Sequence, residues 1–145
     1  MKVTILLADA AQAVGNKLYI LGGGWSIIGP TPTPMAIALK IDVDWTEANT
    51  PHTVRLALLD EDGQPFMVPT PTGDQPWEIQ IPFEVGRSPG LKVGTPLDLS
   101  FAINLAPLQF RPDSRYVLHC FIDNDSREEW QVTFSTRPQS PTAQA

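Results

Sequence analysis

Proline and glycine interrupt this chain so often that it has little room for long helices. Its 145 residues include 15 prolines and 10 glycines, and between them lie short runs in which apolar and polar residues alternate. The clearest run is 35–45, where the odd positions are apolar and the even positions change from alanine to charged residues. Alternation with a period of two is typical of a β-strand with one buried face. The pattern therefore predicts a nearly all-β chain of short strands.

Further strands are expected wherever similar runs lie between turn signals. They are residues 2–8, 18–21, 54–59, 64–68, 77–85, 97–105, 115–122 and 130–134. This spacing predicts an antiparallel β-sandwich of about eight strands. We expect one domain over residues 1–136, followed by a flexible tail over 137–145 that has no apolar anchor.

One tyrosine narrows the expected type of sandwich. Tyr116 begins a late strand just after the loop 107–114. In immunoglobulin-like sandwiches a tyrosine at this place bonds back to the backbone a few residues upstream, which is called the tyrosine corner. We therefore expect an immunoglobulin-like sandwich, with a jelly roll as the alternative.

The segment 15–25 predicts a hairpin that ends in a sharp bend. Gly15 and Asn16 both tolerate positive φ and suit a hairpin turn, so we expect residues 2–8 and 18–21 to form its two arms, both largely buried. Three glycines and a tryptophan follow: Gly22, Gly23, Gly24 and Trp25. Glycine in a strand pattern indicates a bend or a close backbone approach, and we expect the tryptophan to cover the gap. A phosphate-binding loop is excluded because no Lys-Ser, Lys-Thr or helix start follows the glycines.

The run 77–85, which begins with Trp77, is predicted to lie at a sheet edge or to be bulged at Pro82. Pro82 lies on its polar face and has no N–H to give to a neighbouring strand. An exposed strand edge can pair with another chain. We therefore expect a protein partner or self-association into a homo-oligomer through this strand.

Charge and cysteine content limit the possible partners and the compartment. The formal net charge is -6, with 16 acidic and 10 basic residues, which argues against nucleic acid or an anionic membrane as a partner. No apolar run reaches the roughly 20 residues of a membrane span, and the first run, 3–8, is too short for a secretion signal. A single cysteine, Cys120, excludes an internal disulfide and is compatible with a cytoplasmic location.

Several acidic residues are candidates for chemistry, but each has a simpler explanation. Asp9 follows an apolar strand and either bonds the amides of a turn or serves as a functional acid. Asp42 and Asp44 share one strand face, where a solvated surface explains them as well as acid–base work does. The acidic turns 60–62 and 123–125 lack the spacing of a calcium-binding EF-hand loop.

The histidines do not complete a recognisable site. His52 is expected in a loop. His119 and Cys120 are adjacent in a strand, so their side chains point to opposite faces and cannot act as base and nucleophile together. Two histidines and one cysteine also fall short of a zinc pattern. We therefore expect no metal and no cofactor.

The order of these segments resembles a family of uncharacterised bacterial proteins known only as a domain of unknown function. The resemblance is carried by LLADAAQ at 6–12, KLYILGGGW at 17–25, LLDEDG at 58–63, the segment 83–90 and the closing strand at Trp130. It covers nearly the whole chain. It implies a bacterial, cytoplasmic β-domain, and it implies no reaction and no catalytic residue.

These observations favour a non-enzymatic protein-binding or self-assembling β-sandwich. One alternative is an enzyme of unfamiliar type that uses Asp9, Asp42 or Asp44, which requires a concave pocket with a buried carboxylate. Another is a small-molecule or carbohydrate carrier whose cavity is lined by tryptophans. The four tryptophans of the chain are Trp25, Trp45, Trp77 and Trp130.

Overall fold

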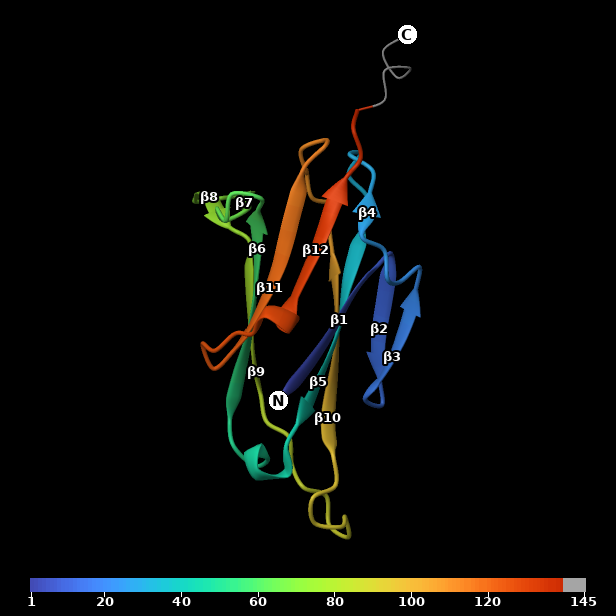
Figure 1. The fold of residues 1–145 in the computed structure, drawn as a ribbon, viewed down its shortest axis with the longest axis vertical. Coiled ribbons are helices and arrows are strands. Elements are labelled where there is room, and N and C mark those ends of the chain that lie inside the picture. The colour runs from blue at the N-terminus through green and yellow to red at the C-terminus, as the bar shows by residue number, and fades with distance from the viewer. Residues whose placement is uncertain (140–145) are drawn as a thin grey trace.

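The computed structural model describes residues 1–139 and is nearly all β (Figure 1). These residues form twelve strands and two short 3₁₀ helices. In chain order they are β1 (Lys2–Ala8), β2 (Ala10–Val14), β3 (Lys17–Leu21), β4 (Ile27–Ile28), β5 (Met35–Val43), η1 (Trp45–Glu47), β6 (His52–Asp60), β7 (Met67–Thr70), β8 (Gly73–Pro76), β9 (Glu78–Phe83), β10 (Leu97–Leu105), β11 (Arg115–Ile122), η2 (Glu128–Trp130) and β12 (Gln131–Thr136). The strands form several sheets that are almost entirely antiparallel, without a closed barrel. The predicted all-β, sandwich-like fold is confirmed.

Two sheets enclose the main core. One has the order β1-β5-β10 and the other β4-β12-β11-β6-β9. The odd positions of β5 point into this core, and Leu39 and Ile41 are fully buried there. They meet the even positions of β6 and β11, such as Leu56 and Leu118, which are also almost fully buried. The alternation that predicted these strands is therefore the alternation of core and outer faces.

The N-terminal hairpin differs from the prediction. Its turn is Gly15–Asn16, with φ of 59° and 58°, as a two-residue type I′ turn requires. Its first arm, however, is β2, while β1 pairs along its whole length with β5. The reason is that the chain bends at Asp9 and the tight turn joins only the residues next to it, from Val14 opposite Lys17 outward. The two runs expected to pair with each other therefore belong to different sheets.

The hairpin β2–β3 adds a third layer on the outer face of the sheet β1-β5-β10. Small side chains make this close approach possible, since the cluster between the layers contains Ala8, Ala11, Ala36 and Ala38. Leu18 and Ile20 of β3 pack against it. The opposite face of the hairpin is open, so the expectation that both arms are largely buried is wrong: Leu21 is 71% exposed.

The tyrosine corner is present. The Tyr116 hydroxyl accepts a hydrogen bond of 2.8 Å from the Arg111 backbone N–H. The ring is buried and packs against Phe110 and Phe134, with ring centroids 4.9 and 5.5 Å away. The corner therefore fixes the loop that leads from β10 into β11.

The end of the described chain is still attached to the sheet. The Arg137 N–H donates to the Ile28 carbonyl at 2.9 Å, and the Arg137 carbonyl accepts from the Asp113 N–H at 3.2 Å. The expected tail begins at this residue, and most of it, residues 140–145, lies outside the described residues.

Candidate interaction surface

The bend after β3 depends on glycine at two positions. Gly22 has a φ of +59°, and a Cβ added there would lie 2.2 Å from Oδ2 of Asp9. A Cβ added at Gly23 would lie 2.5 Å from Cγ2 of Ile20. The Asp9 N–H in turn donates to the carbonyls of Leu21 and Gly22, at 3.1 and 3.2 Å. The glycines thus allow the chain leaving β3 to pack against the Asp9 bend that joins β1 to β2.

Two asparagine side chains anchor the hairpin to β10. Asn16 donates to the Asp98 carbonyl at 3.1 Å and accepts from the Ser100 N–H at 2.8 Å. Asn104 accepts from the Ala11 N–H at 3.2 Å and donates to the Ala11 carbonyl at 2.8 Å. Each amide thereby takes the place of a neighbouring strand's peptide group. The sequence predicts Asn16 only as a turn residue. The only signal for Asn104 in the sequence is its amide side chain on the polar face of an alternating strand.

The anchored hairpin presents apolar side chains to solvent. Of the exposed large apolar side chains in the described part of the chain, three lie on this outer face: Val14, Tyr19 and Leu21, exposed by 50, 55 and 71%. Tyr19 of β3 lies opposite Gln12 of β2, so their side chains share a face. Val14 follows Gln12 by two residues and Leu21 follows Tyr19 by two residues, so both point to the same face. Exposed apolar side chains that gather on one face make it a candidate interaction surface.

The free edge of β3 also carries unpaired peptide groups. Both polar groups of Ala11 point to Asn104 and therefore away from β3. In an antiparallel pair, residues opposite each other share this property, so the N–H and C=O of Ile20 point outward from the hairpin, and those of Leu18 do the same. Within residues 1–139 no hydrogen bond reaches these outward groups. Figure 1 shows β3 at one side of the molecule with no strand beyond it.

The strand β9, which directly follows Trp77, is an edge strand, as predicted. Its free edge is less suited than that of β3 to pairing with another strand. Both polar groups of Thr53 bond to Asp123, at 3.0 Å each, so they point away from β9. Pro82, which lies opposite Thr53, then directs its nitrogen to the free edge, where it offers no donor. Proline and exposed charge, here Glu78, are the usual means of protecting a sheet edge.

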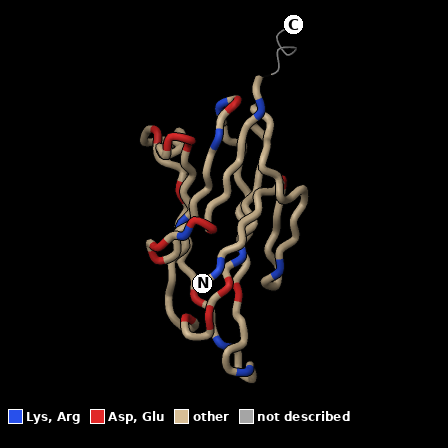
Figure 2. The backbone as a smooth tube through the Cα atoms, viewed as in Figure 1, with Lys and Arg blue, Asp and Glu red and all other residues tan. Residues whose placement is uncertain are grey.

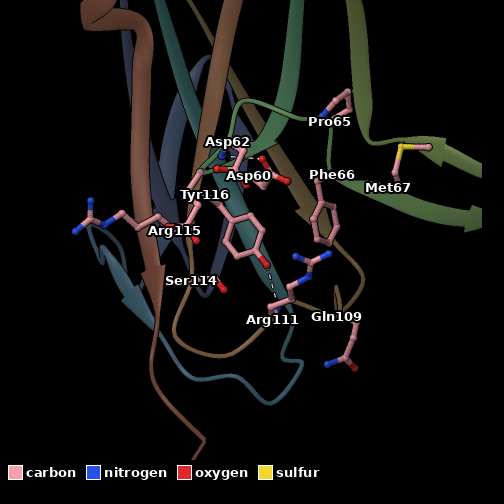
Figure 3. Close-up of a pocket in the computed structure, with 11 residues that line it drawn as sticks. Asp60, Asp62, Pro65, Phe66, Met67, Gln109, Arg111, Ser114, Arg115 and Tyr116 are labelled. Atoms are coloured by element: carbon pink, nitrogen blue, oxygen red, sulfur yellow. Dashed lines mark hydrogen bonds between the residues drawn. The ribbon is translucent and has the colours of Figure 1, made fainter.

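A hollow of about 250 Å³ lies beside the tyrosine corner (Figure 3). Its lining includes the acidic turn at Asp60 and the side chains of Arg111 and Arg115. Asp60 Oδ1 accepts hydrogen bonds from the N–H groups of Asp62 and Gln64, at 2.9 Å each. Its carboxylate is thus used to hold the turn, in agreement with the structural explanation of these acids.

His52 is buried at the start of β6 and not in a loop as predicted. Its Nδ1 lies 2.6 Å from Oδ2 of Asp123, and its Nε2 lies 2.9 Å from the Glu47 carbonyl. Burial opposes a charge on this ring, but the two acceptors outweigh it and raise the pKa of His52 above 6.5. Burial likewise opposes the charge of Asp123, but hydrogen bonds from His52 and the Thr53 N–H lower its pKa. The pair links β6 to the turn after β11 and leaves no ring nitrogen free to act as a base.

The second histidine and the cysteine lie on opposite faces, as predicted. Cys120 is fully buried, and burial raises the pKa of its thiol to about 12, which makes it a poor nucleophile. His119 Nε2 lies 2.7 Å from Oγ of Ser126. That hydroxyl donates to the Cys120 carbonyl at 2.8 Å, so its proton is held by the backbone and the serine is not activated.

The remaining acidic candidates lie on the surface. Asp42 forms a 3.0 Å ion pair with Lys40, which also lies 3.5 Å from Asp98. The side chain of Asp44 is 75% exposed. No group of three histidine, cysteine, aspartate or glutamate residues in the described part of the chain could hold a metal ion.

The tryptophans make separate contacts. Trp25, expected over the glycine bend, packs edge to face on Phe134 at 5.9 Å. Trp77 is half-buried and donates its backbone N–H to the Phe66 carbonyl at 2.8 Å. Trp45 lies under the Arg87 guanidinium, and Trp130 under that of Arg127; these two contacts are 4.8 and 5.3 Å long.

Among residues 1–139 there is no helix long and apolar enough to cross a membrane. No curated protein and no solved structure matches the chain. The sequence model of a family described as a family of unknown function, DUF6941, matches residues 3–135. This match runs from the start of β1 into β12 and includes both sheets of the sandwich and the outer hairpin. The chain therefore belongs to this family of unknown function.

Proposed function

We propose that this chain is a non-enzymatic protein-binding or self-assembling β-sandwich module that acts through the hairpin β2–β3. The observation that carries the proposal is the combination of an open strand edge with exposed apolar side chains on a rigidly anchored hairpin. Extended segments bind such edges by adding a strand, with main-chain hydrogen bonds for affinity and side-chain contacts for specificity. Tyr19 and Leu21 would supply the side-chain contacts.

The other groups that could do chemistry are engaged in holding the fold, which supports a binding role over catalysis. His52 has both nitrogens bonded, Cys120 is buried, and Asp60 holds its own turn. The tyrosine corner supports an immunoglobulin-like classification of the sandwich, and such sandwiches are scaffolds whose loops and edges bind. The buried free thiol fits a reducing, cytoplasmic compartment.

A photo-cross-linking experiment tests the proposal. Tyr19 is replaced by p-benzoylphenylalanine, and the matched control carries the same group at Gln75, an exposed residue of β8. The proposal is supported if a cross-linked protein product forms from position 19 and not from position 75. An excess of unlabelled wild-type chain should abolish this product by competition, whereas an excess of the Leu21→Lys variant should not. Equal yields at both positions, or no protein product at position 19 in the purified sample or in a cell extract, would overturn the proposal.

A further inference from the structure

We propose that the strand bound at the edge of β3 belongs to a second copy of this chain, so that two β3 strands pair antiparallel about a two-fold axis at Tyr19. This inference rests on the proposed function and names its partner. Homodimers with such an axis use the same surface on both copies, so the surface must be complementary to itself. The edge of β3 meets this requirement in its hydrogen bonds, its side chains and its charges.

The hydrogen bonds select one register. The outward peptide groups belong to Leu18 and Ile20, so the register that pairs Leu18 of each copy with Ile20 of the other satisfies all of them. Shifting the pairing by two residues in either direction places Asn16 or Gly22 opposite one of these residues. Asn16 lies in the turn and Gly22 in the bend, both with positive φ, so neither extends the ladder. The best register therefore has Tyr19 on the axis, opposite Tyr19 of the second copy.

The side chains at the axis are suited to contact each other. Tyr19 of both copies would occupy a pair without direct hydrogen bonds, where opposite side chains come closest. Each ring is 55% exposed in the single chain and would be covered in part by its counterpart. Leu21 of each copy would lie opposite Lys17 of the other and cover its aliphatic stem.

The charges are also complementary. Lys17 begins β3 at the turn, whereas Asp9 packs against Gly22 just beyond the other end of the strand. Figure 2 shows this arrangement as a basic residue at the turn of the hairpin and an acidic residue at its opposite end. Antiparallel pairing brings the Lys17 end of each copy to the Asp9 end of the other. Two attractive pairs result, and no like charges face each other along the strands.

Two of the other sheet edges, those of β10 and β9, are less open than the edge of β3. Part of the edge of β10 is covered by the Asn16 side chain, which bonds to Asp98 and Ser100. The free edge of β9 lacks a donor at Pro82. Because β3 has only five residues, the contact is expected to be smaller than the roughly 1,200–2,000 Å² of stable complexes. We therefore expect a weak dimer that dissociates on dilution.

Disulfide cross-linking tests the register directly. The variants are Tyr19→Cys, Lys17→Cys and Leu21→Cys, with Gln75→Cys as the control for random collision. Opposite residues in such pairs have Cα atoms about 4.5 Å apart, within the range of a disulfide. Like positions 17 and 17 lie about 14 Å apart at 3.4 Å per residue. In a glutathione redox buffer, Tyr19→Cys is expected to form a disulfide dimer at least tenfold faster than the other three variants, and mixed Lys17→Cys and Leu21→Cys chains to form one with each other.

Charge reversal provides an independent test on chains that carry no engineered cysteine. Asp9→Lys and Lys17→Asp are each expected to raise the dimer Kd several-fold in analytical ultracentrifugation, and the double variant to restore it. Equal disulfide rates at positions 17, 19 and 21, or additive losses in the double variant, would overturn the inference. If these results accompany a specific photo-cross-link from Tyr19 to a different protein, the binding function stands and only the second copy is rejected. If that photo-cross-link is also missing, both proposals fail.

Discussion

The Asn104 side chain binds both backbone polar groups of Ala11, accepting from its N–H at 3.2 Å and donating to its carbonyl at 2.8 Å. A side chain of β10 thus replaces a neighbouring strand for β2, although the two residues are 93 positions apart in the chain. This contact holds the hairpin on the sandwich and occupies the β2 side of it, so that the free edge of the hairpin is that of β3.

Asn104→Asp tests this anchor with almost no change in shape. The carboxylate still accepts from the Ala11 N–H but faces the Ala11 carbonyl without a donor, so the free energy of unfolding is expected to fall by about 1–3 kcal/mol. Urea denaturation followed by tryptophan fluorescence measures the change. Gln75→Glu, which makes a related change on an exposed strand, should stay within about 0.5 kcal/mol of the wild type. Equal stability of the two variants would show that the anchor contributes nothing.

Tyr116→Phe tests the tyrosine corner. The change removes the hydroxyl that accepts from the Arg111 N–H and keeps the packing of the buried ring. The unfolding free energy should fall by about 0.5–1.5 kcal/mol, because the partly buried Arg111 N–H loses its acceptor. The chain offers a matched control in its other tyrosine: Tyr19→Phe at an exposed ring should leave monomer stability nearly unchanged. A Tyr116→Phe variant as stable as this control would contradict the assigned role.

Gly22→Ala tests the bend after β3. The new methyl group would clash with Asp9 and impose a side chain on a φ of +59°, and the backbone strain alone costs about 1–2 kcal/mol. Thermal unfolding should show a clear fall in Tm. Gly29→Ala is the control, because an added Cβ there meets nothing within 4 Å and its φ is not positive. Adding Asp9→Ala should recover only part of the loss, since it removes the clash and leaves the strain; full recovery would show that strain is absent.

The pKa values of the two histidines are expected to shift in opposite directions from 6.5. The pKa of His52 is raised, since the bonds to Asp123 and Glu47 outweigh burial, whereas burial and the nearby Arg55 lower the pKa of His119. Because the folded pKa of His52 exceeds its unfolded value, its contribution to stability is complete below about 6.5 and is lost as pH rises through the folded pKa. NMR titration of the imidazole protons measures both values.

Asp123→Asn isolates the cause of the His52 shift. Without the carboxylate, the pKa of His52 should fall towards or below 6.5 while that of His119 stays in place, because burial then acts with less opposition. The pKa of Asp123 itself is lowered, so its contribution to stability is present above its unfolded value and is lost as pH falls through the folded one. An unchanged His52 titration in this variant would show that the pair is not coupled.

Local pattern was enough to predict most strands and one specific contact. The period-two alternation located β5, β10 and β11, because a strand with one buried face imposes that period on its own sequence. The position of Tyr116 before a late strand predicted its bond to the upstream backbone. Pro82 predicted the edge position of β9. In each case the physical requirement acts on residues close together in the chain.

Only the tertiary structure decided which strands pair and what faces solvent. β1 joins β5 and not β3, because partner choice depends on the burial of both strands and on a bend at Asp9 that is weakly marked in sequence. The apolar run at 18–21 suggested a buried strand, yet its outer face is open because the chain places only one layer beneath it. Asn104 and His52 acquired their roles from partners brought together by folding, Ala11 for one and Asp123 for the other. Alternation in the sequence shows which residues of a strand share a face. The packing of segments that are distant in the chain determines what covers that face.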